Sequence, residues 1–371
     1  MKFYFLGKLD TTLFIATIVL ILLGLITIFS TSYSSVGTDF LNFKKQFIFS
    51  IIGVVLMISI SFFDYRALKN YTGLFYIAAC FILVAVLFFG ISIRGTTGWF
   101  NLGLFNFQPS EFVKIIAIIV MAKYLSKTAS YLDDFKKVVI SGIYISLPII
   151  LILLQPDFGS ALVLSFIWLS LLFVSGINKK YIALILFFGL VLFAGSWSYA
   201  LKDYQKDRII TFVNPQSDPL GYGYNVIQST VAVGSGNIWG KGLGHGSQSQ
   251  LNFLPEKHTD FIFAVIAEEM GFIGIIFLLG LFGIIFHRIF KIASETQDNF
   301  GKLIVLGASF MIMFHMVVNI GMNMGIMPVT GIPLPFISYG GSSLISFLIM
   351  IGMVQSVYAK GKGYKIEKEE D

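Results

Sequence analysis

A charged cluster at residues 254–263 carries the strongest chemical signal in the sequence. The segment reads Leu-Pro-Glu-Lys-His-Thr-Asp-Phe-Ile-Phe, and Asp260 stands where the charges give way to a long apolar run. A carboxylate at such a boundary is partly desolvated, which raises its proton affinity and makes Asp260 a candidate general base. Helix capping is the structural alternative, because Thr259 and Asp260 are both good N-cap residues. Lys257 and His258, in the same cluster, are candidate substrate contacts.

Charged residues inside otherwise apolar segments form a second group of candidates. Glu268 and Glu269 follow Asp260 within the apolar run, and Glu111 and Lys114 interrupt another one. A charge in the membrane costs at least ~2.5–3.5 kcal/mol on insertion scales, so each should face a partner or a cavity. Glu111 and Lys114 are three residues apart and so share one helix face. The sequence leaves open whether these charges line a site for an anionic substrate or form ion pairs that fix helix packing.

Polar residues in the connecting segments complete the set of candidates. Asp157 follows Gln-Pro in a tight turn, where it either caps the next helix or contacts substrate. Arg208 is a cation in a long loop, and Trp99 lies in a segment that also holds Arg94. An arginine can bind phosphate with two donors, and a tryptophan can stack on a sugar or anchor at a membrane interface. Ser338 opens a Gly- and Ser-rich helix start, which favours either an anion or close helix packing.

The composition requires that a membrane protein position these side chains. The 371 residues are 56% hydrophobic and 12% charged, against the ~25% charged residues of soluble globular proteins. So few charges cannot cover a soluble surface, which excludes a soluble enzyme, a disordered chain and a secreted disulfide scaffold. The single cysteine, Cys80, cannot form a disulfide within the chain. The net charge of +6 indicates basic cytoplasmic loops, and no basic stretch suggests a nucleic-acid partner.

The gaps between charges predict an all-α, polytopic integral membrane protein with about ten transmembrane helices. The predicted spans are 11–38, 46–63, 70–93, about 108–126, 138–156, 158–178, 181–201, about 261–286, about 303–327 and about 338–359. Most of the 26 basic residues then fall on one side, so the positive-inside rule places both termini in the cytoplasm. The longer segments on the outside are 92–108, 202–260 and 327–340. We expect one membrane domain, 1–371, with a solvated cytoplasmic tail over about 360–371.

Several motifs resemble those of the SEDS family, named for shape, elongation, division and sporulation, and the similarity covers about residues 10–358. The motifs are specific in combination: Gln108-Pro-Ser-Glu111, Gln155-Pro-Asp157-Phe-Gly, Asp218-Pro-Leu-Gly221, Glu256-Lys-His-Thr-Asp-Phe-Ile-Phe263, Gly331-Ile-Pro-Leu-Pro-Phe336 and Ser338-Tyr-Gly-Gly341. Within the family, Asn214-Pro215 and Asn319-Ile-Gly-Met322 indicate the rod-shape branch.

The resemblance implies a peptidoglycan glycosyltransferase in the bacterial cytoplasmic membrane. Its substrate would be lipid II, an undecaprenyl-pyrophosphate-linked disaccharide peptide, polymerised on the outer face of the membrane during elongation. Its partners would be a class B penicillin-binding protein and other membrane proteins of the elongation complex. The resemblance places the family's essential acidic residue at Asp260 and its loop tryptophan at Trp99. No cofactor is indicated with certainty, and a divalent cation is left open.

Two other functions remain open at this point. A transporter that flips lipid II would suit ten spans with buried charges, and a non-catalytic scaffold would only recruit the crosslinking enzyme. The polar residues argue mildly against transport, because they gather on the outer side, whereas transporter sites lie near the bilayer midplane.

Overall fold

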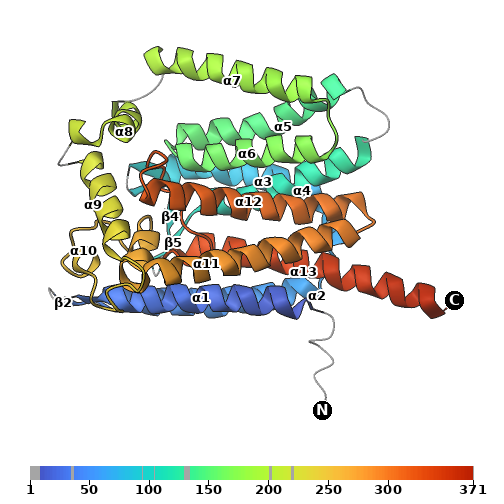
Figure 1. The fold of residues 1–371 in the computed structure, drawn as a ribbon. Helices are drawn as coiled ribbons and strands as arrows, with labels where there is room; N and C mark the ends of the chain where they lie inside the picture. Colours follow the sequence, from blue (N-terminus) through green and yellow to red (C-terminus); the bar gives the residue numbers. More distant parts are fainter. Residues whose placement is uncertain are drawn as a thin grey trace.

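Helices occupy all ten segments that the sequence predicts to span the membrane. The computed structural model describes residues 9–34, 37–93, 95–103, 105–128, 134–199, 203–218 and 221–370, and Arg94 lies outside these residues. The ten helices are α1 (Thr11–Ser32), α2 (Leu41–Phe62), α3 (Leu68–Phe89), α4 (Pro109–Thr128), α5 (Asp134–Leu154), α6 (Phe158–Val174), α7 (Lys179–Tyr199), α11 (Ile262–Glu295), α12 (Asn299–Asn323) and α13 (Gly341–Glu370). The all-α prediction is confirmed (Figure 1).

Hydropathy alone accounts for only part of this bundle. Within the described residues, seven helices are long and apolar enough to cross a membrane: α1, α2, α3, α5, α11, α12 and α13. α6 is apolar but has 17 residues, and α4 holds Glu111, Lys114, Lys123 and Lys127. The middle of α4 is buried among its neighbours, so Glu111 and Lys114 do not face lipid, whereas Lys127 is exposed at its end. Among the described residues, the helices that meet these criteria are therefore fewer than the ten spans predicted.

Short elements that the sequence did not predict build the outer end of the bundle. Segment 202–260 contains α8 (Asp203–Val213), a 3-10 turn (Pro215–Ser217), α9 (Tyr222–Ser235) and α10 (Ser247–Gln250). Three antiparallel strands follow α3, namely β3 (Ile91–Ile93), β4 (Thr96–Asn101) and β5 (Asn106–Phe107). A small ribbon pairs β1 (Tyr33–Ser34) with β2 (Gly37–Thr38). Figure 1 shows α8, α9, α10 and the strands together at one end of the long helices.

The start of α1 and the C-terminal part of α13 lie at the opposite end of the bundle (Figure 1). Asp10 caps α1 by accepting from the Leu13 N–H at 2.9 Å. Its own N–H and carbonyl bond the Gln355 side chain of α13, at 2.8 and 3.0 Å, and Nε of Arg288 on α11 donates to its carboxylate. α1 thus begins at the end of the bundle at which α13 leaves it, which agrees with the prediction that the termini share one side. α13 continues as a helix through the expected tail to Glu370.

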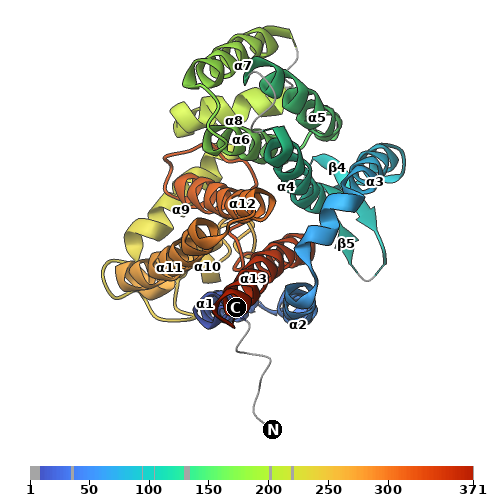
Figure 2. The ribbon, with the colours of Figure 1, turned by 90° about the vertical axis from the view of Figure 1, so that its right-hand side faces the viewer.

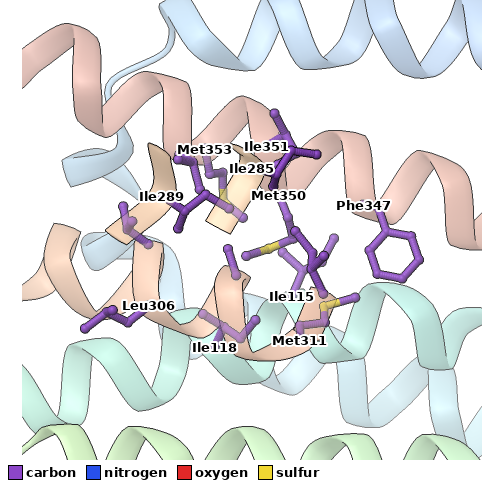
Figure 3. Close-up of a cluster of buried hydrophobic side chains, with 14 of the residues drawn as sticks. Ile115, Ile118, Ile285, Ile289, Leu306, Met311, Phe347, Met350, Ile351 and Met353 are labelled. Atoms are coloured by element: carbon purple, nitrogen blue, oxygen red, sulfur yellow. The ribbon is translucent and has the colours of Figure 1, made fainter. Parts of the chain in front are cut away.

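Close-packed aliphatic, methionine and phenylalanine side chains join α4, α11, α12 and α13 at the centre. Figure 3 shows Ile115 and Ile118 of α4, Ile285 and Ile289 of α11, Leu306 and Met311 of α12, and Phe347, Met350, Ile351 and Met353 of α13. In a bilayer such contacts act through packing, because lipid tails are as apolar as the side chains. α7 lies at the periphery, against α5 and α6 (Figure 2). The packed centre fixes the outer ends of its four helices relative to one another.

A backbone break divides α11 into two parts at Gly271. Its φ of 64° and ψ of −163° are accessible only to glycine. The N–H groups just after the break donate to the carbonyls of Asn237 and Ile238, at 2.9 and 3.2 Å, and the carbonyls just before it accept from the N–H groups of Lys241 and Gly242, both at 3.0 Å. An unsatisfied backbone group in an apolar environment costs several kcal/mol. The loop after α9 therefore replaces the helical bonds that the break removes.

Candidate active site

A partly open cavity of about 140 Å³ lies among the outer ends of the helices. Its wall is formed by β4, the first turns of α4 and α6, α8, and the segments that precede α11 and α13. Six of the residues singled out in the sequence line it: Trp99, Glu111, Lys114, Asp157, Arg208 and Asp260. The fold thus gathers acidic, basic and aromatic side chains from five separate segments around one space.

Lys114 is the centre of a buried polar network beside this cavity. Its Nζ lies 2.7 Å from Oε1 of Glu111 and 3.2 Å from Nε2 of His315. The Lys114 and Glu111 side chains are only 1% and 3% exposed. Nδ1 of His315 lies 3.2 Å from the Pro333 carbonyl, which fits a neutral ring that carries its proton on Nδ1 and accepts from Lys114 through Nε2. The predicted ion pair forms, and both of its members also line the cavity.

Asp157 joins the start of α6 to the start of α4. Its Oδ1 accepts from the Ser160 N–H at 2.9 Å, so it caps α6, as the sequence predicted. Its Oδ2 accepts from Nε2 of Gln108 at 3.3 Å and from Oγ of Ser110 at 3.4 Å. One carboxylate therefore holds two cavity-forming helix starts together.

The capping role that the sequence allowed for Thr259 and Asp260 is wrong. The chain makes successive turns up to this point, so α11 begins only at Ile262, and Phe261 at its N-cap position has no side-chain capping bond. Asn323 of α12 supplies the acceptor instead, because its Oδ1 accepts from the N–H of the third helical residue at 3.1 Å. Asp260 lies in the turn before the helix, where it lines the cavity.

Trp99 and Arg208 line the cavity from outside the bundle core. Trp99 lies on β4, and its indole Nε1 donates to Oγ1 of Thr96 at 3.2 Å. Arg208 lies on α8 and is partly buried. These two residues and Lys114 bring one aromatic ring and two cationic groups to the same space as the carboxylate of Asp260.

Lys257 and His258 do not line this cavity. Nζ of Lys257 donates to the Ser249 carbonyl and to Oδ1 of Asn252, both at 2.7 Å, and burial lowers the pKa of this lysine. Nδ1 of His258 lies 2.8 Å from Oγ1 of Thr31. Burial, together with the nearby positive charge of Lys257, lowers the pKa of His258 to about 4. Lys257 thus bonds the segment before α11 to the region around α10, and His258 bonds it to α1.

Glu268 also lies outside the cavity, at the end of the first part of α11. Its carboxylate pairs with Nζ of Lys241 at 2.8 Å and accepts from the N–H groups of Gln248 and Ser249 at 2.9 and 3.1 Å. It therefore anchors α10 and the loop before it. Ser338, likewise outside the lining, donates its hydroxyl to the Thr259 carbonyl at 2.7 Å.

No metal centre emerges from the described residues. In that part of the chain, no group of three or more His, Cys, Asp or Glu side chains is close enough together to hold a metal ion.

Comparisons with known proteins identify the family. The model of the FtsW/RodA/SpoVE family of cell cycle proteins matches residues 10–363. The chain belongs to this family. It is similar to the peptidoglycan glycosyltransferase MrdB of Escherichia coli, with 36% identity over 95% of this chain and 94% of the relative. It is also similar to the stage V sporulation protein E of Bacillus subtilis, with 37% identity over 94% and 96% of the two chains.

Solved structures of two similar proteins share the fold. A chain from a peptidoglycan synthase complex, described as coordinating polymerization and crosslinking, superposes with a TM-score of 0.80 at 31% identity, over 95% of this chain and 98% of that one. The rod shape determining protein RodA of Thermus thermophilus gives a TM-score of 0.70 at 29% identity, over 94% and 96%. With its apolar helices, this family member is a multi-pass protein of the bacterial cytoplasmic membrane.

Sequence reasoning missed several residues that shape the site of this FtsW/RodA/SpoVE family member. His315 lies in an apolar stretch of the sequence, and in the structure it contacts Lys114 and lines the cavity. Asn323 gave no signal at all, because a lone amide in an apolar helix does not reveal its partner. Lys241 lies in a Gly-rich stretch of the sequence, and its pairing with Glu268 spans 27 positions. Such long-range pairs have no local pattern.

Proposed function

We propose that this protein is a peptidoglycan glycosyltransferase that polymerises lipid II into β-1,4 glycan strands on the outer face of the cytoplasmic membrane during cell elongation. The observation that carries the proposal is the outer cavity, which Asp260, Lys114 and Arg208 line together. A carboxylate and two cations near a membrane surface suit a substrate that joins a sugar to a lipid diphosphate. The similarity to proteins named peptidoglycan glycosyltransferases supports this activity.

In the proposed reaction, the 4-hydroxyl of one sugar attacks the anomeric carbon of another sugar that is linked to undecaprenyl pyrophosphate. The bond from that carbon to the pyrophosphate oxygen breaks as the new bond forms, and inversion at the carbon gives the β link. Asp260 takes the hydroxyl proton. A positioned general base contributes about 10²–10⁴-fold to the rate, which corresponds to about 3–5.5 kcal/mol.

Lys114 and Arg208 stabilise the departing pyrophosphate in this scheme. Glu111 compensates the Lys114 charge before substrate binds, since its Oε1 lies 2.7 Å from Nζ of Lys114. The Lys114 N–H groups can then turn partly toward the phosphate oxygens as negative charge develops there. Trp99 offers a face on which a sugar ring can stack, and Asp157 holds the starts of α4 and α6 at the spacing that the substrate requires.

The remaining residues of the predicted site act through the protein rather than through substrate contact. Four of them form hydrogen bonds to neighbouring segments, so we assign them to holding the cavity wall: Lys257, His258, Glu268 and Ser338.

All of these elements belong to one membrane domain over residues 1–371. A class B penicillin-binding protein and other elongation-complex membrane proteins are the proposed partners, as the synthase complex that this chain resembles suggests.

The test incubates purified protein with fluorescent lipid II, with and without a cognate class B penicillin-binding protein. Wild type should give glycan ladders on a gel, and Asp260→Ala and Asp260→Asn should lose them. Asp39→Asn is the matched control, because Asp39 is an exposed carboxylate on the same side of the molecule that does not line the cavity. Ladders of normal rate from Asp260→Ala would refute the assignment.

The two other functions predict different results in the same experiment. A lipid II transporter predicts movement of lipid II across vesicle membranes without chain growth, and tolerance of Asp260→Asn. A scaffold predicts that the partner binds and that cell-wall growth continues after substitution of Asp260. No ladder from wild type with its partner would favour one of these.

A further inference from the structure

Two buried asparagines of α12 hold the backbone of Asp260. Nδ2 of Asn319 donates to the Asp260 carbonyl at 3.0 Å, and Nδ2 of Asn323, one helical turn further, donates to the same oxygen at 2.9 Å. Both side chains are fully buried, and neither lines the cavity. They therefore contact Asp260 through its backbone carbonyl and not through the cavity.

Each asparagine also fixes a second element of the cavity wall. The remaining Nδ2 hydrogen of Asn319 donates to the Ile332 carbonyl at 2.8 Å, and Ile332 lines the cavity. Asn323 caps α11 through Oδ1, as described above, and its second Nδ2 hydrogen donates to the Asn319 carbonyl at 2.8 Å. The pair thus connects the turn of Asp260, the start of α11 and the loop before α13.

The two carbonyls before Asp260 are held as well, by the segment before α13. The backbone N–H of Tyr339 donates to the His258 carbonyl at 2.8 Å, and Ser338 donates to the Thr259 carbonyl. Three successive carbonyls therefore accept bonds from neighbouring elements. Because these three carbonyls are bonded, the backbone that carries the Asp260 side chain has little freedom to move.

We propose that Asn319 and Asn323 are positioning residues that set the place of the Asp260 carboxylate in the cavity. This inference rests on the proposed function, in which that carboxylate is the general base. A proton acceptor works only within hydrogen-bond reach of the hydroxyl, and a misplacement of about 1 Å costs on the order of 10²-fold in rate. The asparagines reach the reaction only through Asp260 and the wall beside it, so their loss should affect the chemical step more than substrate binding.

The experiment measures kcat and KM for fluorescent lipid II with Asn319→Ala and Asn323→Ala in the complex with the partner. We expect kcat to fall by about 10- to 100-fold and KM for lipid II to change by less than about threefold. Gln355→Ala is the matched control. Gln355 is also a buried amide whose Nε2 donates to an aspartate carbonyl, that of Asp10, but at the cytoplasmic end. It should lose comparable thermal stability and keep its kcat.

Three outcomes separate the explanations. A kcat within about twofold of wild type in both folded asparagine variants would overturn the proposal, as would an equal loss of kcat in Gln355→Ala. If an alanine variant does not fold, Asn319→Ser and Asn323→Ser replace it, and a kcat between wild type and the expected loss supports the proposal. If wild type polymerises and Asp260→Asn does not, a failure here concerns the asparagines alone; if wild type is inactive, the proposed function itself has failed.

Discussion

Glu111→Gln should destabilise the protein by leaving a lysine charge in the bundle interior. In the structure, Nζ of Lys114 has two side-chain neighbours within bonding distance, Glu111 at 2.7 Å and His315 at 3.2 Å. The substitution keeps the size of the Glu111 side chain and removes its negative charge. Lys114 is only 1% exposed, so water compensates its charge far less than the carboxylate does.

The expected loss follows from this burial. Breaking a buried ion pair by removing one partner costs about 3–5 kcal/mol. His315 still accepts one hydrogen bond from Lys114, which places the loss at the lower end, about 3 kcal/mol. The pair between Asp134 and Lys137 has the same three-residue spacing at 3.6 Å, but its side chains are 33% and 12% exposed. A pair that is partly open to solvent in this way contributes at most about 1 kcal/mol.

The assay compares thermal unfolding of Glu111→Gln and Asp134→Asn in one detergent, followed by tryptophan fluorescence. We expect a clear fall in Tm for the first variant and almost none for the second. The double variant with Glu111→Gln and Lys114→Met should recover most of the lost Tm, because no buried charge remains. Its polymerase activity should stay low, because a cation is missing from the cavity.

Equal Tm values for Glu111→Gln and Asp134→Asn would refute this reasoning. So would a double variant that is no more stable than Glu111→Gln alone, since the stranded charge is then not the cause. If the double variant recovers stability and is also fully active, the ion pair still explains the stability, but Lys114 has no role in the proposed mechanism.

Three further predictions follow from other parts of the structure. Asp10→Ala removes the cap of α1 and the carboxylate that Arg288 binds, so stability should fall by about 2–4 kcal/mol; an unchanged Tm would contradict this. The pKa of His258 is about 4 and rises to about 6.5 on unfolding, so its contribution, at most about 3 kcal/mol, is present above pH 6.5 and is lost toward pH 4. Tm should therefore fall between pH 7 and pH 5, and His258→Gln should flatten that fall. Trp239 is 81% exposed beside the break in α11, so Trp239→Phe should reduce quenching of the protein by lipids brominated near the headgroup, and unchanged quenching would place this residue away from the membrane interface.

The long helices could be predicted because charges and prolines mark their ends directly in the sequence. Each of the ten uncharged or nearly uncharged windows contains one helix of the structure. Segment 202–260 was expected only as a loop, because α8 carries charges and α10 has four residues. Neither is distinguished by hydropathy from an irregular connection.

The sequence likewise identified some residues of the candidate site and not others. Asp260, Lys114 and Asp157 could be selected because a charge or a turn beside an apolar segment needs an explanation. Their partners could not be selected, because Asn319 and Asn323 lie 59 and 63 positions from Asp260. A hydrogen bond between distant segments depends on how the helices pack, and no local spacing encodes that.

The break at Gly271 divides α11 into a part that crosses the membrane and a shorter part beside the cavity, although the sequence shows one long, mostly apolar segment. Residues 272–295 alone, at about 1.5 Å per residue, reach about 36 Å, which exceeds the ~30 Å thickness of the hydrocarbon core. The preceding stub, 262–270, is not needed for the crossing. The loop after α9 bonds both the end of the stub and the start of the long part, so the break sets the angle between the two parts. The stub, with the aspartate that precedes it, can therefore take the direction that the cavity requires while the long part keeps the direction that the membrane crossing requires.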